Sequence, residues 1–249
     1  MIKLKTPEQV AIMREAGKIL AEIHKEVSEL VVPGITTEEL DSEMEKRILG
    51  ANAKPVLKGY TGFPGVMCVS VNEEVVHSVP STRVLKEGDI ITLDVSIGWK
   101  GLNLDMARTL PVGEITDENA HLIATTKKAL RLGIRNAKVG NTMGDIGNAV
   151  QRHVEDQGYQ VVREMCGHGI GVELHEAPQV LNYGERHTGE KIEEGLVICI
   201  EPMVTVGNWK LEKDPDGHGF ITEDKSLSAH FEDTVAITSQ GPEVLTKIE

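Results

Sequence analysis

Four carboxylate residues lie inside otherwise apolar, strand-like runs of this sequence. They are Asp94 in IITLDVSI, Asp105 in LNLDMA, Glu201 in LVICIEPM and Glu232 in HFEDTVAI, and none of these runs contains a lysine or arginine. An ionised carboxylate inside a protein is costly unless a cation or hydrogen bonds compensate it. We therefore predict a metal site, for which His168 in the glycine-rich segment CGHGIGVELHEAP offers a nitrogen ligand.

The spacing of the acids indicates how they would meet. Asp94 shares a strand face with Thr92 and Ser96, so we expect a hydrated polar face and a dry apolar face. Asp105 follows Asp94 by eleven residues with a glycine-containing turn between them, so antiparallel strands would place the two acids side by side. Oxygen-rich ligation with one imidazole favours manganese, iron or cobalt over a structural zinc.

Two further histidines have less certain roles. His77 and His175 could act on a substrate, although spacing alone makes a core or surface role the default for both. The remaining histidines occur mostly in polar stretches, and we expect them in solvent: His24, His121, His153, His187, His218 and His230. Serine-hydrolase and P-loop motifs are absent, and HExxH fails because Gln179 replaces its second histidine after the helix-breaking Pro178.

Helix caps and β-rich runs define the elements that must position these residues. A capping box at Thr6 predicts a helix to about Val31, and Thr36 opens a second helix that fades at Gly50. Strands are expected between about residues 66 and 113. Two more helices follow, one from Thr116 to about Asn136 and one ending near Gly158, and then the strands YQVV, LVICIEPMV and FEDTVAIT.

The two halves of the chain resemble each other. PGITTEEL at 33–40 aligns with VGNTMGDI at 139–146, a displacement of 106, and KEGDIITLD aligns with EEGLVICIE at a displacement of 107. We predict a single catalytic domain, 1–249, with pseudo-repeats of approximately 1–113 and 114–249. The fold class is α/β (α+β), with two pseudosymmetric helix-helix-sheet halves that bring two acids each to one centre.

Composition narrows the possible partners. The chain has 26 basic and 39 acidic residues, a net charge of -13, which argues against direct nucleic-acid binding and against an anionic membrane surface. Its three cysteines form no CxxC pair, and no apolar run approaches the length of a membrane span. We expect a cytoplasmic protein.

The ordered set of candidate ligands resembles that of a known family. Asp94, Asp105, His168, Glu201 and Glu232, together with MCGHGIGVELHEAPQVLNY at 165–183, are similar to the motifs of methionine aminopeptidases of the bacterial-like type I. The resemblance covers essentially the whole chain. It implies a pita-bread fold with a central curved antiparallel sheet around two divalent metal ions, cobalt, manganese or iron.

The resemblance also implies residue roles. Asp105 and Glu232 would bridge the two ions, Asp94 would complete one shell, and His168 with Glu201 would complete the other. The catalytic residues would be Glu201 as proton shuttle, His175 at the developing oxyanion and His77 at the scissile amide. Tyr60, Phe63 and Cys68 would line the methionine pocket with His77 and His175. His218 stands where the family usually has tryptophan, and Phe63 where it often has tyrosine.

The expected activity is removal of the initiator methionine from nascent polypeptides whose second residue is small. Nascent chains near the ribosome would be the partners, and we expect a monomer. An Xaa-Pro aminopeptidase or prolidase of the same fold is an alternative, although those enzymes usually carry a long additional N-terminal domain. A non-catalytic binding protein of this fold is a second alternative, but such proteins typically lose metal ligands.

Overall fold

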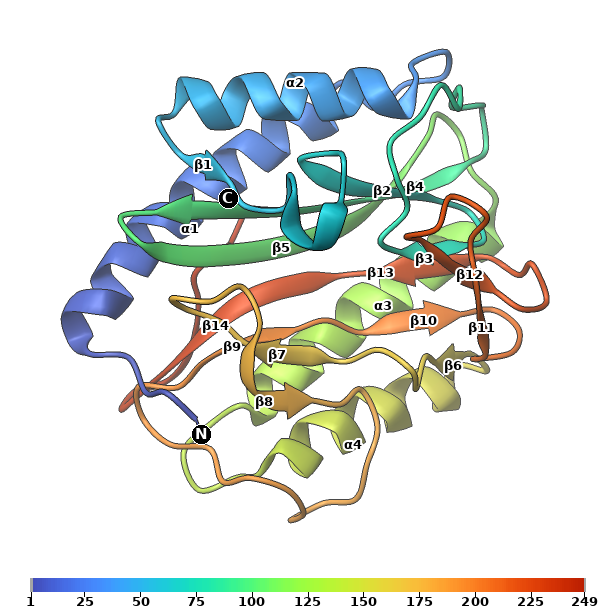
Figure 1. Cartoon of the computed structure of the whole chain (residues 1–249). Helices are drawn as coiled ribbons and strands as arrows, with labels where there is room; N and C mark the ends of the chain where they lie inside the picture. Colours follow the sequence, from blue (N-terminus) through green and yellow to red (C-terminus); the bar gives the residue numbers. More distant parts are fainter. Residues whose placement is uncertain (1, 249) are drawn as a thin grey trace.

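Two helix pairs lie beside a long antiparallel sheet in the computed structural model, which describes residues 2–248 (Figure 1). The first half contains α1 (Pro7–Ser28), α2 (Thr37–Gly50), β1 (Lys54–Pro55), the 3-10 turn η1 (Tyr60–Gly62), β2 (Met67–Val71), β3 (Glu74–Val76), β4 (Ile90–Trp99) and β5 (Leu102–Pro111). The second contains α3 (Asp117–Asn136), α4 (Met143–Asp156), β6 (Gln160–Val161), β7 (Gly167–Gly169), β8 (Glu176–Val180), β9 (Val197–Ile200), β10 (Met203–Thr205), β11 (Leu211–Lys213), β12 (Phe220–Thr222), β13 (Ser228–His230), β14 (Glu232–Thr238) and β15 (Gly241–Val244).

The helix starts follow the capping signals in the sequence. At α1, the Thr6 hydroxyl accepts from the Gln9 N–H while the Gln9 side chain accepts from the Thr6 N–H. The helix ends at Ser28, three residues before the predicted end, because the N–H groups of Leu30 and Val31 turn to the carbonyls of Val27 and Ser28. One face of α1 is buried against β4 and β5 and covers one side of this hairpin.

The main sheet joins the two halves through adjacent strands. Its order is β1-β4-β5-β14-β9-β7-β8, and within residues 2–248 each recorded pairing is antiparallel. β4 and β5 form a long hairpin from the first half, and β14 of the second half pairs with β5 through Glu232 opposite Ala107. The predicted mixed α/β fold with a central antiparallel sheet is confirmed.

Equivalent features recur in the two halves at the displacement seen in the sequence. Thr36 before α2 bridges to Val84, and Thr142 before α4 bridges to Lys191, shifts of 106 and 107 residues. Gly88 and Gly195, before β4 and β9, both have positive φ, 91° and 88°. These features agree with a duplication, while the boundary of the repeats near residue 113 stays a prediction.

The prediction of a hydrated polar face on β4 is confirmed only at Asp94, which is partly exposed. Thr92 and Ser96 are buried, at 3% and 2% exposure, because β13 packs against β4 and β5. The Thr92 and Thr109 hydroxyls are 2.8 Å apart, and Thr109 donates to the His230 carbonyl on β13. Thr92 and Thr109 therefore lie on this face because they bond to each other and to β13, away from water.

Within the described residues, none of the helices combines the length and the apolar character needed to span a bilayer.

Candidate metal centre

Five neighbouring strands of the main sheet each supply one predicted ligand. In the order β4, β5, β14, β9 and β7, these are Asp94, Asp105, Glu232, Glu201 directly after β9, and His168. The first two come from one half of the chain and the other three from the second half. The antiparallel sheet therefore gathers residues up to 138 positions apart in sequence into a single cluster.

The register places Asp94 and Asp105 on one face but not directly opposite each other. Asp94 faces Ala107 and Asp105 faces Ser96. The acids are therefore diagonal neighbours, offset by two residues along the strand from the expected side-by-side arrangement. Glu232, opposite Ala107 on the other side of β5, completes the group. Ligand oxygens of Asp94, Asp105 and Glu232 lie within 4.8 Å of one another.

Two of these acids each have one buried oxygen atom that no protein group satisfies. Asp105 Oδ1 and Glu232 Oε1 are buried with no hydrogen-bond partner among residues 2–248, although such atoms are rarely left unsatisfied. A neighbouring buried acid, Asp233, behaves differently, because its Oδ1 accepts from Arg108 Nη2 at 2.6 Å. A divalent cation would satisfy the oxygens that no arginine or lysine reaches.

The electrostatics point the same way. Burial, and then the repulsion between these carboxylates, raises the pKa of Asp94, Glu201 and Glu232 well above the usual range. Burial raises the pKa of Asp105 to about 7. Since a cation favours the ionised form of a nearby carboxyl, the cluster as built is complementary to positive charge.

His168 presents a free ring nitrogen to the cluster. Its Nδ1 lies 2.9 Å from the Gly169 carbonyl, so the ring proton is placed on Nδ1. Nε2 then carries the lone pair and lies 3.5 Å from Glu201 Oε1. Burial lowers the pKa of His168 to about 4, which keeps the imidazole neutral, as a metal ligand must be.

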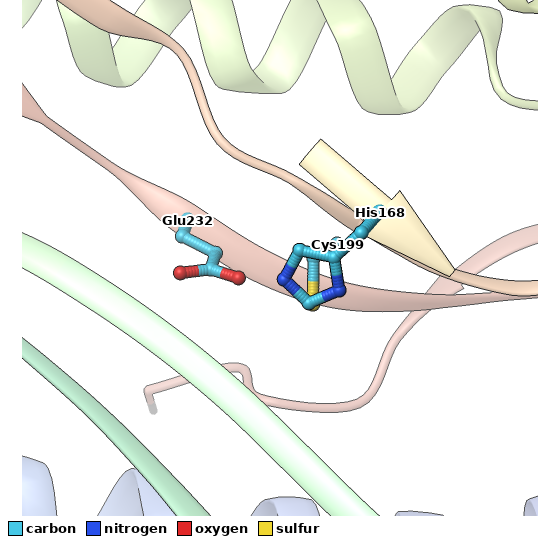
Figure 2. Close-up of side chains that lie close together, drawn as sticks. All are labelled: His168, Cys199 and Glu232. Carbon is cyan, nitrogen blue, oxygen red and sulfur yellow. The ribbon is translucent and has the colours of Figure 1, made fainter. Parts of the chain in front are cut away.

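Cys199 also borders the cluster. Figure 2 shows its sulfur close to His168 and Glu232, and the three ligand atoms lie within 4.8 Å of one another. Burial and the nearby Glu232 raise the pKa of this thiol well above its usual value, and Sγ lies 3.7 Å from the Thr234 hydroxyl. A thiol is a much poorer ligand than a thiolate, so the carboxylates and imidazoles form the better donor set.

Two histidines expected in solvent are buried. His24 has 0% exposure and its Nε2 lies 3.1 Å from the Leu93 carbonyl behind β4. His230 has 2% exposure and lies beside the acidic cluster, with Nε2 3.9 Å from Glu201 Oε2. Sequence analysis missed His230, although it is two residues from Glu232, a spacing that places alternate residues on one strand face.

Two cavities meet at the cluster. The five predicted ligands line a cavity of about 700 Å³, which extends past Met165 and Tyr183 toward the start of α4. A pocket of about 360 Å³ lies on the other side. His77, His175, Asp94 and Asp105 border both, so the predicted catalytic histidines lie at the junction of the two.

His175 is held by Tyr60. The Tyr60 hydroxyl lies 2.8 Å from His175 Nδ1, and the His175 ring lies edge-on to His168 with 4.4 Å between centroids. His77, directly after β3, has a φ of 60°, which ends the strand and turns this residue away from its path.

The smaller pocket contains the three residues predicted to hold a methionine side chain. Tyr60, Phe63 and Cys68 line it together with His218, whose ring meets Phe63 edge-on at 5.6 Å between centroids. Leu174 and Phe220 also line this pocket and were not predicted. Leu174 directly precedes His175, a proximity that could have identified it from the sequence.

Comparison with known sequences places these residues in a family. A model of metallopeptidase family M24 matches residues 11–239. Methionine aminopeptidase 1 of Bacillus subtilis is 44% identical over 248 residues, covering 100% of both chains. A methionine aminopeptidase of Escherichia coli K12 is 40% identical and covers 98% of this chain and 94% of that protein.

Solved structures give the same result. The methionine aminopeptidase of Thermotoga maritima matches with a TM-score of 0.97 and 42% identity, over 99% of this chain and 100% of that one. The prolidase of Pyrococcus furiosus has a TM-score of 0.80 and 24% identity, and this chain covers only 66% of it. The second match shows a shared fold alone.

Proposed function

This chain belongs to metallopeptidase family M24, and we propose that it is a metal-dependent methionine aminopeptidase that hydrolyses the peptide bond after an N-terminal methionine. The observation that carries the proposal is the cluster on five adjacent strands, with unpaired carboxylate oxygens at the junction of two cavities. Full-length identity of 44% to a methionine aminopeptidase supports the substrate. The likeness to prolidases supports only the fold.

The donor set fits two divalent ions. Asp105 and Glu232 would contribute ligands to both ions, Asp94 to the ion with oxygen ligands only, and His168 with Glu201 to the ion that also has a nitrogen ligand. Such ions supply an activated water at neutral pH and polarise a carbonyl. Cobalt, manganese and iron all suit these ligands, and the supply in the cell selects among them.

The protein's own groups move the protons and hold the substrate. Glu201 accepts a proton from the attacking water and returns it to the nitrogen of the leaving amine as the C–N bond breaks. The Tyr60 hydroxyl lies 2.8 Å from His175 Nδ1. With the hydroxyl as hydrogen-bond donor, the ring proton of His175 is on Nε2, where it stabilises the oxyanion. His77, at the junction of the cavities, contacts the scissile amide.

The two cavities bind different parts of the substrate. The smaller pocket has an apolar wall of Phe63, Cys68 and Leu174 and takes the methionine side chain, while the larger cavity takes the rest of the peptide. The substrates are N-termini of nascent polypeptides with a small second residue, in the cytoplasm. Xaa-Pro cleavage is the second candidate, since the fold is shared.

A tripeptide panel with defined metal content tests this proposal. We expect rapid hydrolysis of Met-Ala-Ser, slow hydrolysis of Met-Lys-Ser and no hydrolysis of Ala-Pro-Phe, all abolished by chelation and restored by cobalt or manganese. Efficient cleavage of Ala-Pro-Phe without cleavage of Met-Ala-Ser would replace the proposed substrate by Xaa-Pro. If the metal-loaded protein cleaves none of these peptides, the result would favour a non-catalytic binding protein.

A further inference from the structure

His230 is a buried side chain without a partner. It has 2% exposure, and neither Nδ1 nor Nε2 has a hydrogen-bond partner among residues 2–248. Its backbone is held firmly, because its N–H donates to the Thr109 hydroxyl and its carbonyl accepts from the same hydroxyl. The main chain at this residue is therefore fixed beside the cluster, and a buried polar side chain left unpaired is costly.

The ring lies near the same carboxylate as His168 but is closer to its other oxygen. Nε2 of His230 is 3.9 Å from Glu201 Oε2, while Nε2 of His168 is 3.5 Å from Glu201 Oε1. Ligand atoms of Glu201, His230 and Glu232 all lie within 4.8 Å of one another. Two ligand atoms each about 2.1 Å from one ion are about 3–4 Å apart, so these separations suit a shared cation.

An ion pair with Glu201 does not account for this position. The 3.9 Å between His230 Nε2 and Glu201 Oε2 is longer than a hydrogen bond, so Glu201 leaves this nitrogen without a partner. Glu201 and Glu232 have no lysine or arginine partner within the described chain. A cation therefore satisfies both the carboxylates and an otherwise unpaired nitrogen.

We propose that His230 is a ligand of the cation held by Glu201 and Glu232, so that this position has two imidazoles, His168 and His230. The position on the side of Asp94 and Asp105 has only oxygen ligands. The centre is thus asymmetric, and its nitrogen-rich side favours cobalt, iron or zinc over manganese. This inference rests on the metal centre proposed above, but not on the identity of the peptide substrate.

The number of imidazoles bound to metal provides a direct test. The protein loaded with two equivalents of cobalt is measured by X-ray absorption, and the outer-shell scattering of imidazole rings is counted. We expect two imidazoles per protein in the wild type and one in either His230→Gln or His168→Gln. His153→Gln is the matched control, because His153 also has a buried, unpaired Nε2 but is not among the clustered ligands.

Metal affinity gives a second readout that is independent of catalysis. Titration calorimetry of the metal-free protein should show one site weakened by about tenfold or more in His230→Gln, with the preference for cobalt over manganese reduced. A wild-type count of one imidazole would refute the inference, as would unchanged affinity in a folded His230→Gln protein. If that variant does not fold, the wild-type count alone decides.

These results separate the inference from the proposed activity. If two imidazoles are counted but the protein cleaves none of the peptides, His230 remains a ligand and the proposed substrate is wrong. Cleavage of Met-Ala-Ser with one imidazole would do the reverse.

Discussion

Breaking the ion pair between Lys5 and Glu176 should destabilise the protein strongly and disturb the active site. The two side chains are buried, at 4% and 3% exposure, with 2.6 Å between Lys5 Nζ and Glu176 Oε2. Glu176 also accepts from the Glu173 N–H at 3.1 Å, and it directly follows His175. The N-terminal segment thus holds the loop that carries a predicted catalytic residue.

The structure sets the size of the effect. In Lys5→Met, Glu176 keeps only the backbone N–H of Glu173, and a buried charge that loses its partner costs about 3–5 kcal/mol. Glu176→Gln should cost a similar amount, because Lys5 keeps only the Lys3 carbonyl. The double variant has no unpaired charge, so we expect it to lie within about 1 kcal/mol of the wild type.

Urea unfolding at saturating metal, followed by fluorescence and circular dichroism, measures these differences. Burial alone would raise the pKa of Glu176, but hydrogen bonds from Lys5 and the Glu173 N–H outweigh it and lower the pKa. The stabilisation is therefore present above the unfolded pKa of about 4.3 and is lost as the pH falls through the lower folded value. The difference between the wild type and Lys5→Met should shrink below about pH 4.

Lys100→Met is the matched control, since Lys100 and Glu15 are also 2.7 Å apart but are about half exposed. We expect almost no change in its stability. The reasoning is refuted if Lys5→Met loses less than about 1 kcal/mol, or if the double variant is no more stable than the single ones. The kcat of the single variants should fall and recover in part in the double variant, because His175 regains its position.

Three further predictions concern the centre itself. Glu201→Gln should lower kcat about 100- to 10,000-fold, and single-turnover hydrolysis of Met-Ala-Ser at the wild-type rate would remove Glu201 as proton shuttle. Tyr60→Phe should lower kcat about two- to tenfold, because the hydrogen bond to His175 is lost. The kcat values are compared at equal metal content, and an unchanged kcat would show that this bond does not orient the His175 ring. Metal removal should lower the melting temperature. The metal-free protein should also lose stability as the pH rises from about 4 to 7. Burial raises the pKa of Asp105 to about 7, so in this range the folded state holds more protons than the unfolded chain. Melting curves of the metal-loaded protein should lack this pH dependence, and a metal-free protein that is equally stable at pH 5 and pH 7 would contradict the argument.

Local signals in the sequence were reliable where the physics is local. The threonine caps at Thr6, Thr36 and Thr116 located three helix starts because a cap depends on residues only three positions away. The acids of the centre were visible because a carboxylate in an apolar run conflicts with its neighbours. His230 was missed although it shares a strand-like run with Glu232, because only the packing of β13 over β4 and β5 buries it.

The sequence alone determined which residues can bind a cation and that two similar halves supply them, since residue type and spacing are properties of the chain. The tertiary structure decided how they meet: the pairing of β5 with β14 brings the halves together, and the register sets Asp94 and Asp105 diagonally rather than side by side. It also decided that Thr92 and Ser96 on the polar face of β4 are buried and that His230 joins the cluster. Both outcomes depend on contacts between segments more than a hundred residues apart, whose burial no local pattern records.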